Sequence, residues 1–333
     1  MDTRAPLDPD SDLGRWLLGT DPALRWQVQR DLLDAPEEVW RATRARVTTE
    51  GYAARLLALQ DEDGQWAGGA YFPTRNDPRA EVGDANEGQP WVATTWSLSA
   101  LREWGVPAEA LGNTAERLRE HARWEYDDLP YWGGEVDVCI NAWTLANGTW
   151  LGTDVSSLAA WFPEHQLADG GWNCEWVEGA TASSFHSTLN ALEGLLEREE
   201  RGAPPQEREQ LRPARHRGQE YLLERRLLRR RSTGELVGDW VTQLGYPPRW
   251  RYNVLRALDV FRRAAVLDGT APDPRLQEAV DALRSLQGPD GRWVQQAHHE
   301  GQEWFPVDVP VGNPSPWLTH AGLRALRWWD GRG

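Results

Sequence analysis

An aspartate lies two positions before a cysteine in the segment GGEVDVCINAW, residues 133–143, where Asp137 precedes Cys139. Carboxylate and thiolate groups are both zinc ligands, and zinc takes four protein ligands in structural sites or three in catalytic sites. Two ligands alone do not hold the metal, and side chains at positions i and i+2 point apart within a regular helix. A zinc site here therefore requires a helix that begins between Asp137 and Cys139, together with ligands from elsewhere in the chain.

The other cysteine of the chain, Cys174, lies in the segment GGWNCEW, residues 170–176. Two cysteines do not make a disulfide framework, and in a reducing compartment both remain thiols. In the alternative interpretation, each cysteine is a small buried hydrophobic residue without a chemical role.

Composition excludes several classes of function. The chain has 333 residues and a formal net charge of −15, which argues against binding to nucleic acid or to an anionic membrane surface. All 36 basic residues are arginine, so a Schiff-base lysine and a P-loop lysine are excluded. The 21 tryptophans must be buried or must line an apolar space.

The first residues, MDTRAPLDPDSDLGRW, lack the basic and apolar regions of a signal peptide. The chain also has no run of about 18 apolar residues, the length that a membrane span requires. We therefore expect a cytoplasmic protein without a membrane span.

A seven-residue pattern, Gln-x-x-Asp-Gly-x-Trp, occurs three times, at Gln60–Trp66, Gln166–Trp172 and Gln287–Trp293. Each copy follows an amphipathic run, and its Asp-Gly pair is typical of a turn that ends a helix. We expect the glutamine to fix the turn through hydrogen bonds and the tryptophan to fix it through burial. The copies begin 106 and 121 residues apart, so each interval has room for two repeats of roughly 50–60 residues.

Six apolar helical segments cover residues 21–33, 89–104, 136–152, 183–197, 248–263 and 315–329, and more charged helical segments, such as 113–126, lie between them. An inner ring of apolar helices and an outer ring of charged helices would satisfy this alternation. The sequence therefore predicts an all-α fold with very little strand, an (α/α)6 toroid of about six hairpins around a central cavity. We expect one domain over residues 15–330 and an N-terminal extension over residues 1–14. The alternative is an open α-solenoid.

Four of the apolar segments align on a shared Ala-Leu pair, and the residue five positions before each alanine is polar: Thr95, His186, Tyr252 and His320. Equivalent positions in a closed ring face the cavity at the same depth. We therefore expect a polar tier that contacts a substrate, surrounded by aromatic residues that include Trp96 and Trp143. In the alternative interpretation, these are core residues whose polar groups are satisfied locally.

The turn motif resembles the repeat of squalene and terpene cyclases, whose α/α toroid is shared with the β subunits of protein prenyltransferases. In those subunits, zinc is held by the Asp-x-Cys pair of a Val-Asp-x-Cys-Tyr-Ser-Phe-Trp segment and by a distant histidine in Tyr-His-Thr. This chain has VDVCINAW at residues 136–143 and FHSTLNALEGL at residues 185–195. The resemblance implies an open zinc site with Asp137, Cys139 and His186 as ligands. Coordination by Cys174 as a fourth ligand would close the site and make it more structural.

The resemblance further implies a zinc-dependent, prenyltransferase-like enzyme that acts on an apolar, isoprenoid-like small molecule in an aromatic cavity. A diphosphate on that substrate needs cationic side chains, for which the candidates are Arg75, Arg79, Arg249 and Arg251. The first alternative is a class II terpene cyclase-like protein, although the Asp-x-Asp-Asp acid motif of such cyclases is missing from this chain. The second alternative is a non-catalytic toroidal binding protein with structural zinc.

Overall fold

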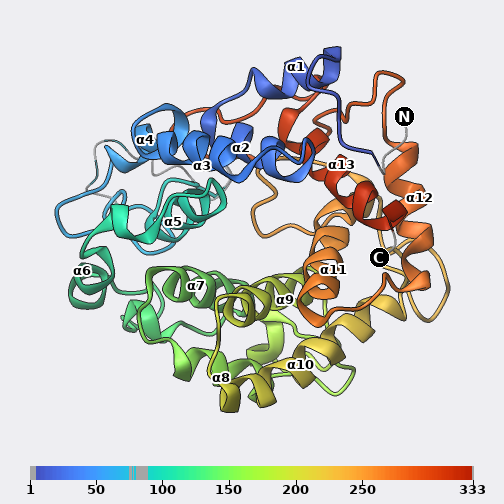
Figure 1. Cartoon of the computed structure of the whole chain (residues 1–333). Helices are drawn as coiled ribbons and strands as arrows, with labels where there is room; N and C mark the ends of the chain where they lie inside the picture. Colours follow the sequence, from blue (N-terminus) through green and yellow to red (C-terminus); the bar gives the residue numbers. More distant parts are fainter. Residues whose placement is uncertain (1–4, 75–76, 78, 80–88, 332–333) are drawn as a thin grey trace. The chain divides into compact units, whose positions relative to one another are not determined.

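The computed structural model describes residues 5–74, 77, 79 and 89–331 (Figure 1). These residues form an all-α fold in which the described positions contain α-helices, short 3-10 helices and isolated β-bridges but no β-strand. Within this part of the chain, no helix has both the length and the apolar character that a membrane crossing requires.

The chain divides into two compact units, which we call unit 1 (residues 1–52, 222–299 and 306–333) and unit 2 (residues 53–221 and 300–305). Unit 1 contains α1 (Asp12–Leu18), α2 (Pro22–Asp31), α3 (Glu37–Ala45), α11 (Val254–Asp268), α12 (Gln277–Ser285) and α13 (Pro316–Gly331). Unit 2 contains α5 (Thr94–Glu103), α6 (Thr114–His121), α7 (Val138–Leu151), α8 (Ser156–Glu164) and α9 (Phe185–Glu200). Two helices, α4 (Gly51–Leu57) and α10 (Pro205–Leu223), have residues in both units.

The 3-10 helices are η1 (Arg46–Thr48), η2 (Ala108–Leu111), η3 (Tyr131–Gly133), η4 (Cys174–Glu178), η5 (Asp239–Thr242) and η6 (Pro274–Leu276). Each of the six predicted apolar segments forms all or most of a helix, namely α2, α5, α7, α9, α11 and α13, and the last three of these helices extend beyond the predicted segment ends. The all-α prediction is therefore confirmed, whereas the ring closure and the single domain over residues 15–330 remain predictions. α1 begins at Asp12, inside the predicted extension.

The charged segment at residues 113–126 ends its helix earlier than its pattern predicts. α6 stops at His121, and Trp124 turns inward until only 2% of it is exposed. The Trp124 backbone N–H donates to the carbonyl of Leu129, and the indole Nε1 donates to the carbonyl of Tyr131, both at 2.9 Å. Burial of this ring in a tight turn outweighs the helical pattern of the charged residues.

The three Gln-x-x-Asp-Gly-x-Trp turns have the same hydrogen bonds, which confirms the prediction that the glutamine and the tryptophan fix the turn. The glutamine Nε2 donates to the glycine carbonyl at 3.0, 2.6 and 2.9 Å in the first, second and third copies. Each indole Nε1 donates to a carbonyl ten residues earlier, at 2.9, 2.9 and 3.0 Å. All three tryptophans are 0% exposed.

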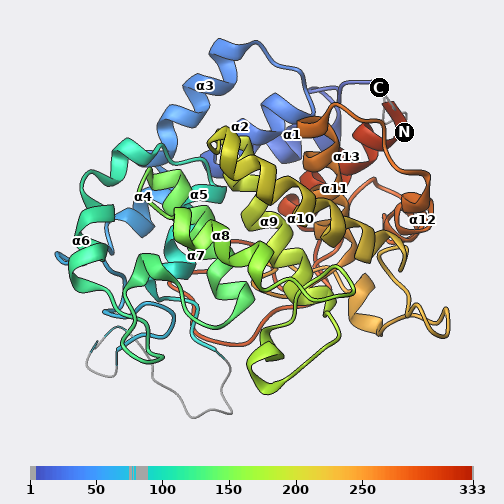
Figure 2. The same ribbon diagram turned by 90° about the horizontal axis from the view of Figure 1, so that it is seen from below.

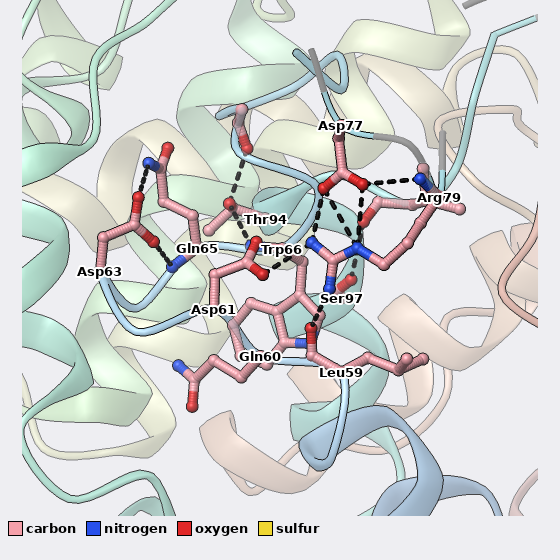
Figure 3. A network of polar contacts seen from close by, with 12 residues as sticks. Leu59, Gln60, Asp61, Asp63, Gln65, Trp66, Asp77, Arg79, Thr94 and Ser97 are labelled. Carbon is pink, nitrogen blue, oxygen red and sulfur yellow. Dashed lines mark hydrogen bonds and ion pairs between the residues drawn. The ribbon is translucent and has the colours of Figure 1, made fainter. Parts of the chain in front are cut away.

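A threonine on the next apolar helix completes each turn. The hydroxyl oxygens of Thr94, Thr188 and Thr319 accept the backbone N–H of the motif tryptophan, at 3.1 Å in every copy. Figure 3 shows the first turn, in which Thr94 faces Trp66. The turn thus joins the helix before it to the helix after it.

α7 is the most deeply buried helix of unit 2, with buried residues on almost every side. Such a helix belongs in a core, because it has no polar face to expose. It packs against α5 and α9, and Figures 1 and 2 both show α7 and α9 side by side. Gly194 of α9 permits this approach, since a Cβ there would lie 2.7 Å from the carbonyl oxygen of Ala142.

One ion pair is completely buried in unit 2. The carboxylate of Glu199 on α9 accepts from Arg215 on α10, with Nε to Oε1 at 2.7 Å, and both side chains are 0% exposed. Arg212 contacts the same carboxylate at 3.4 Å. The pair fixes α10 against α9 through charges that are shielded from water.

Candidate functional site

The helix that carries Cys139 begins where a zinc site requires it to begin. Asp137 is the N-cap residue in an extended conformation, and α7 starts at Val138. The Asn141 side chain holds this entry, because its Nδ2 donates to the carbonyl of Glu135 at 2.7 Å and its Oδ1 accepts the Glu135 N–H at 2.8 Å. The start of α7 therefore falls between Asp137 and Cys139, which is the condition that a zinc site requires.

The two cysteines of the chain are in direct contact within unit 2. The Sγ atoms of Cys139 and Cys174 are 3.4 Å apart, and we call them the thiol pair. Asn190 on α9 donates from Nδ2 to the Cys139 sulfur at 3.2 Å, and Ser187 on α9 donates from its hydroxyl to the Cys174 sulfur at 3.3 Å. Three elements of unit 2 thus meet at the thiol pair: α7, η4 and α9.

The short helix η4 carries Cys174, and two hydrogen bonds fix its position. The Cys174 N–H donates to the Ser187 hydroxyl oxygen at 3.1 Å. Two residues further on, the indole Nε1 of Trp176 donates to the carbonyl of Val136 at 2.9 Å, next to the entry of α7. The segment that contains η4 is therefore attached both to α9 and to the start of α7, the two helices beside the sulfurs.

The thiol pair is electrostatically asymmetric. The hydrogen bond between the two sulfurs lowers the pKa of the Cys174 thiol. The same contact, burial and the negative charge of Asp137 together raise the pKa of the Cys139 thiol well above its usual value. Cys174 is partly exposed whereas Cys139 is 8% exposed, so a single negative charge on the pair is more stable on Cys174.

The carboxyl group of Asp137 lies beside the pair. Burial raises its pKa, and a hydrogen bond with Cys174 offsets part of that rise. Three of the four predicted metal ligands, Asp137, Cys139 and Cys174, are therefore neighbours. His186, the second residue of α9, is half-buried, and its backbone carbonyl accepts from Asn190 at 2.8 Å. Among the described residues, no group of three or more His, Cys, Asp or Glu side chains is arranged so that it could hold a metal ion.

Aromatic rings pack together in the same unit. The ring centroids of Trp96 and Trp143 are 4.6 Å apart, and Tyr71 lies 4.9 Å from Trp96 and 6.2 Å from Trp143. We call these three residues the aromatic cluster. The two tryptophans predicted to contact a substrate are thus brought together, but they are 4% and 6% exposed.

Tyr71 is a residue that the sequence reasoning missed. Burial raises the pKa of its hydroxyl well above the usual value, and the negative charges of Cys139, Asp137 and Cys174 add to that rise. Its backbone is held by the Glu125 carboxylate, which accepts the N–H groups of Tyr71 and Phe72 at 3.0 Å. No motif marks this loop position, so only its place just after the first turn could have suggested it.

The remaining residues of the predicted polar tier have local partners. In unit 2, the hydroxyl of Thr95 is 2.9 Å from the hydroxyl of Tyr131. In unit 1, the hydroxyl of Tyr252 donates to the carbonyl of Leu227 at 2.7 Å, and His320 Nε2 is 3.1 Å from the Asp31 carboxylate. These bonds are the local satisfaction that the alternative interpretation expects.

Some of the arginines predicted to bind a diphosphate already interact with other side chains. Arg79 pairs with the carboxylates of Asp61 and Asp77, as Figure 3 shows. In unit 1, the guanidinium of Arg251 lies 5.0 Å from the ring centroid of Trp250. Arg75 is outside the described residues.

The comparisons leave the family open. No protein-family model matches the chain, and no curated protein matches it. Among solved structures, it is similar to the crystal structure of a protein from Actinoplanes, with 17% sequence identity and a TM-score of 0.44. The match covers 93% of this chain and 90% of that chain. A likeness at this level carries no information on activity.

Proposed function

We propose that this chain is a zinc-dependent, prenyltransferase-like enzyme that acts on an apolar, isoprenoid-like substrate within an (α/α)6 toroid. The observation that carries the proposal is the contact between Cys139 and Cys174, with Asp137 beside it. Thiolate sulfur and carboxylate oxygen are a donor set that zinc prefers. The rest of the proposal depends on the resemblance of the VDVCINAW and FHSTLNALEGL segments to prenyltransferase β subunits.

The sulfur positions fit the metal. Zinc–sulfur bonds of about 2.3 Å at tetrahedral angles place two sulfurs about 3.8 Å apart. The thiol pair is at 3.4 Å, so the sulfurs need to separate by only about 0.4 Å. Cys139, Cys174 and Asp137 would hold the ion, and His186 is the further ligand that the resemblance supplies.

Bound zinc would lower the pKa of a coordinated thiol or water and so provide a nucleophile near neutral pH. The residues of this chain contribute orientation and shielding. Asn190 and Ser187 donate hydrogen bonds that stabilise negative charge on the sulfurs. The rings of the aromatic cluster provide apolar faces that exclude water and favour positive charge on a substrate carbon.

A second function is supported by the packing of the aromatic cluster. Because Trp96 and Trp143 contact each other and are 4% and 6% exposed, they offer little free surface to a ligand. This favours a non-catalytic binding protein in which zinc is structural. The class II cyclase alternative has no comparable support, since the chain lacks the Asp-x-Asp-Asp acid motif.

Metal analysis tests the zinc proposal first. Protein purified with zinc present and then desalted should contain about one zinc ion per chain by mass spectrometry of the metal. Cys139→Ser and Cys174→Ser should each lose most of the zinc, and His186→Ala should weaken its retention. His121→Ala is the matched control, because His121 is exposed on α6 and should retain the wild-type content. Zinc-free wild-type protein would overturn the proposal.

Incubation with prenyl diphosphates then separates the two functions. With a thiol acceptor present, the enzyme should form a prenyl thioether, and the Cys139→Ser variant should not. Stoichiometric zinc without any product would favour the structural role. Cyclised hydrocarbon formed without an acceptor would favour the cyclase alternative.

A further inference from the structure

The thiol pair has the geometry of a disulfide that has not yet closed. A disulfide bond is about 2.05 Å long, so the sulfurs at 3.4 Å must approach by about 1.4 Å. Cys139 lies in the first turn of α7, whereas Cys174 is the first residue of the short helix η4. A small shift of the loop can therefore close the gap without moving a long helix.

The surroundings keep the sulfurs at a high effective concentration. The Trp176 indole holds the loop to Val136, and the Cys174 N–H holds it to Ser187. Because both attachments lie within three residues of a sulfur, the reduced pair stays in contact. The chain contains only two cysteines, so no other pairing within the chain competes.

The cysteines also differ in access. Cys174 is partly exposed, and Cys139 is buried at 8% exposure. An oxidant from solution therefore reaches Cys174 first, and the buried Cys139 is the resolving thiol that then reacts with the oxidised Cys174 sulfur.

We propose that Cys139 and Cys174 form a reversible disulfide on exposure to hydroperoxides. Closure removes both sulfurs from any metal; this second part rests on the proposed zinc site, whereas the disulfide itself does not. The thiol pair is then a redox switch in which the reduced form binds zinc and the oxidised form releases it.

The chemistry balances with hydrogen peroxide as the oxidant. The Cys174 thiolate attacks one peroxide oxygen, the O–O bond breaks, and a sulfenic acid forms with loss of hydroxide, which a proton converts to water. The Cys139 sulfur then attacks the Cys174 sulfur, the S–O bond breaks, and a second water leaves with the thiol proton. Two thiols and one peroxide thus give one disulfide and two waters. A dithiol reductant reverses the reaction by thiol–disulfide exchange and is itself oxidised to a disulfide.

Zinc-free full-length protein tests the disulfide directly. After treatment with hydrogen peroxide and its removal by catalase, thiol titration should fall from two free thiols per chain to nearly none. The intact mass should show loss of two hydrogen atoms, the protein should stay monomeric on a non-reducing gel, and dithiothreitol should restore both thiols. Two persistent thiols, covalent dimers or irreversible sulfinic acids would overturn the proposal.

Single variants test the order of events without requiring the disulfide. In Cys139→Ser, dimedone should trap a sulfenic acid on Cys174 at least tenfold faster than it traps Cys139 in Cys174→Ser. Equal or reversed trapping rates would overturn the assignment of Cys174 as the first thiol oxidised.

Zinc-loaded protein separates this inference from the proposed function. Oxidation should release the metal in proportion to disulfide formed, which a chromogenic zinc chelator reports. A disulfide in protein that never binds zinc supports the thiol chemistry and overturns the zinc proposal together with the switch. If the protein binds stoichiometric zinc but forms no disulfide, whether zinc-loaded or metal-free, the zinc proposal is supported and the disulfide proposal is overturned.

Discussion

Replacing Thr188 by valine tests whether the hydrogen bonds of the repeat turn stabilise the fold. The Thr188 hydroxyl is fully buried, accepts the Trp172 N–H at 3.1 Å and donates to the Trp172 carbonyl at 3.4 Å. Valine has nearly the same shape, so the change removes the hydroxyl and leaves the packing. A buried N–H without a partner costs about 1–3 kcal/mol, and the long donated bond adds little. We therefore expect Thr188→Val to lower the free energy of unfolding by about 1–3 kcal/mol.

Urea unfolding and amide hydrogen exchange measure this effect together. The exchange of the Trp172 amide should accelerate even where global unfolding is masked by separate transitions of the two units. Thr181→Val is the matched control, because Thr181 is exposed and should change stability by less than about 0.5 kcal/mol. If Thr188→Val is as stable as this control, or leaves exchange at Trp172 unchanged, the turn does not depend on its threonine.

Three further changes follow from buried groups. Arg215→Met should cost about 3–5 kcal/mol in urea unfolding, because it leaves the buried Glu199 carboxylate with only the longer contact to Arg212 at 3.4 Å. The double variant Glu199→Leu/Arg215→Met should recover most of that loss, and an equally unstable double variant would contradict this. Burial raises the pKa of Asp308 to about 6, so the folded state binds its proton more tightly than the unfolded state, and stability falls as pH rises from about 4 to 6. Asp308→Asn should remove that part of the pH dependence in melting curves, and identical pH profiles would refute it. Gly194→Ala should destabilise unit 2 by about 1–3 kcal/mol, because its Cβ would lie 2.7 Å from the Ala142 carbonyl oxygen; an unchanged melting temperature would show that α7 and α9 separate freely.

The sequence predicted those parts of the fold in which local residues allow one arrangement. In the repeat turn, the Asp-Gly pair, the glutamine amide and the tryptophan ring satisfy one another within seven residues, and the structure has these contacts in all three copies. The six apolar helices follow from their composition in the same way. Trp124 shows the limit, because burial of a single ring ends α6 where the charged pattern continues.

In the candidate site, the sequence could indicate only the placement of Asp137 and Cys139, because that placement depends on where one helix begins. The segment WGGE, residues 132–135, permits α7 to begin between Asp137 and Cys139, because its two glycines interrupt the chain just before the helix. The contact of Cys174 with Cys139 does not, because it depends on a hydrogen bond between Trp176 and Val136, which are 40 residues apart. Tyr71 was missed for a related reason, since a carboxylate from Glu125 fixes its loop from a distant part of the sequence.

The shared hydrogen bonds of the three turns also determine in what units such a chain can gain or lose repeats. Each indole satisfies a carbonyl in the preceding helix, and each tryptophan N–H needs the threonine of the following one. A repeat boundary inside the turn would leave hydrogen-bonding groups without partners in both flanking helices. A boundary in the loops outside this helix–turn–helix unit would leave all of these hydrogen bonds intact. The smallest portable module is therefore helix, turn and helix together, and lengthening by gene duplication should proceed in whole modules of that kind.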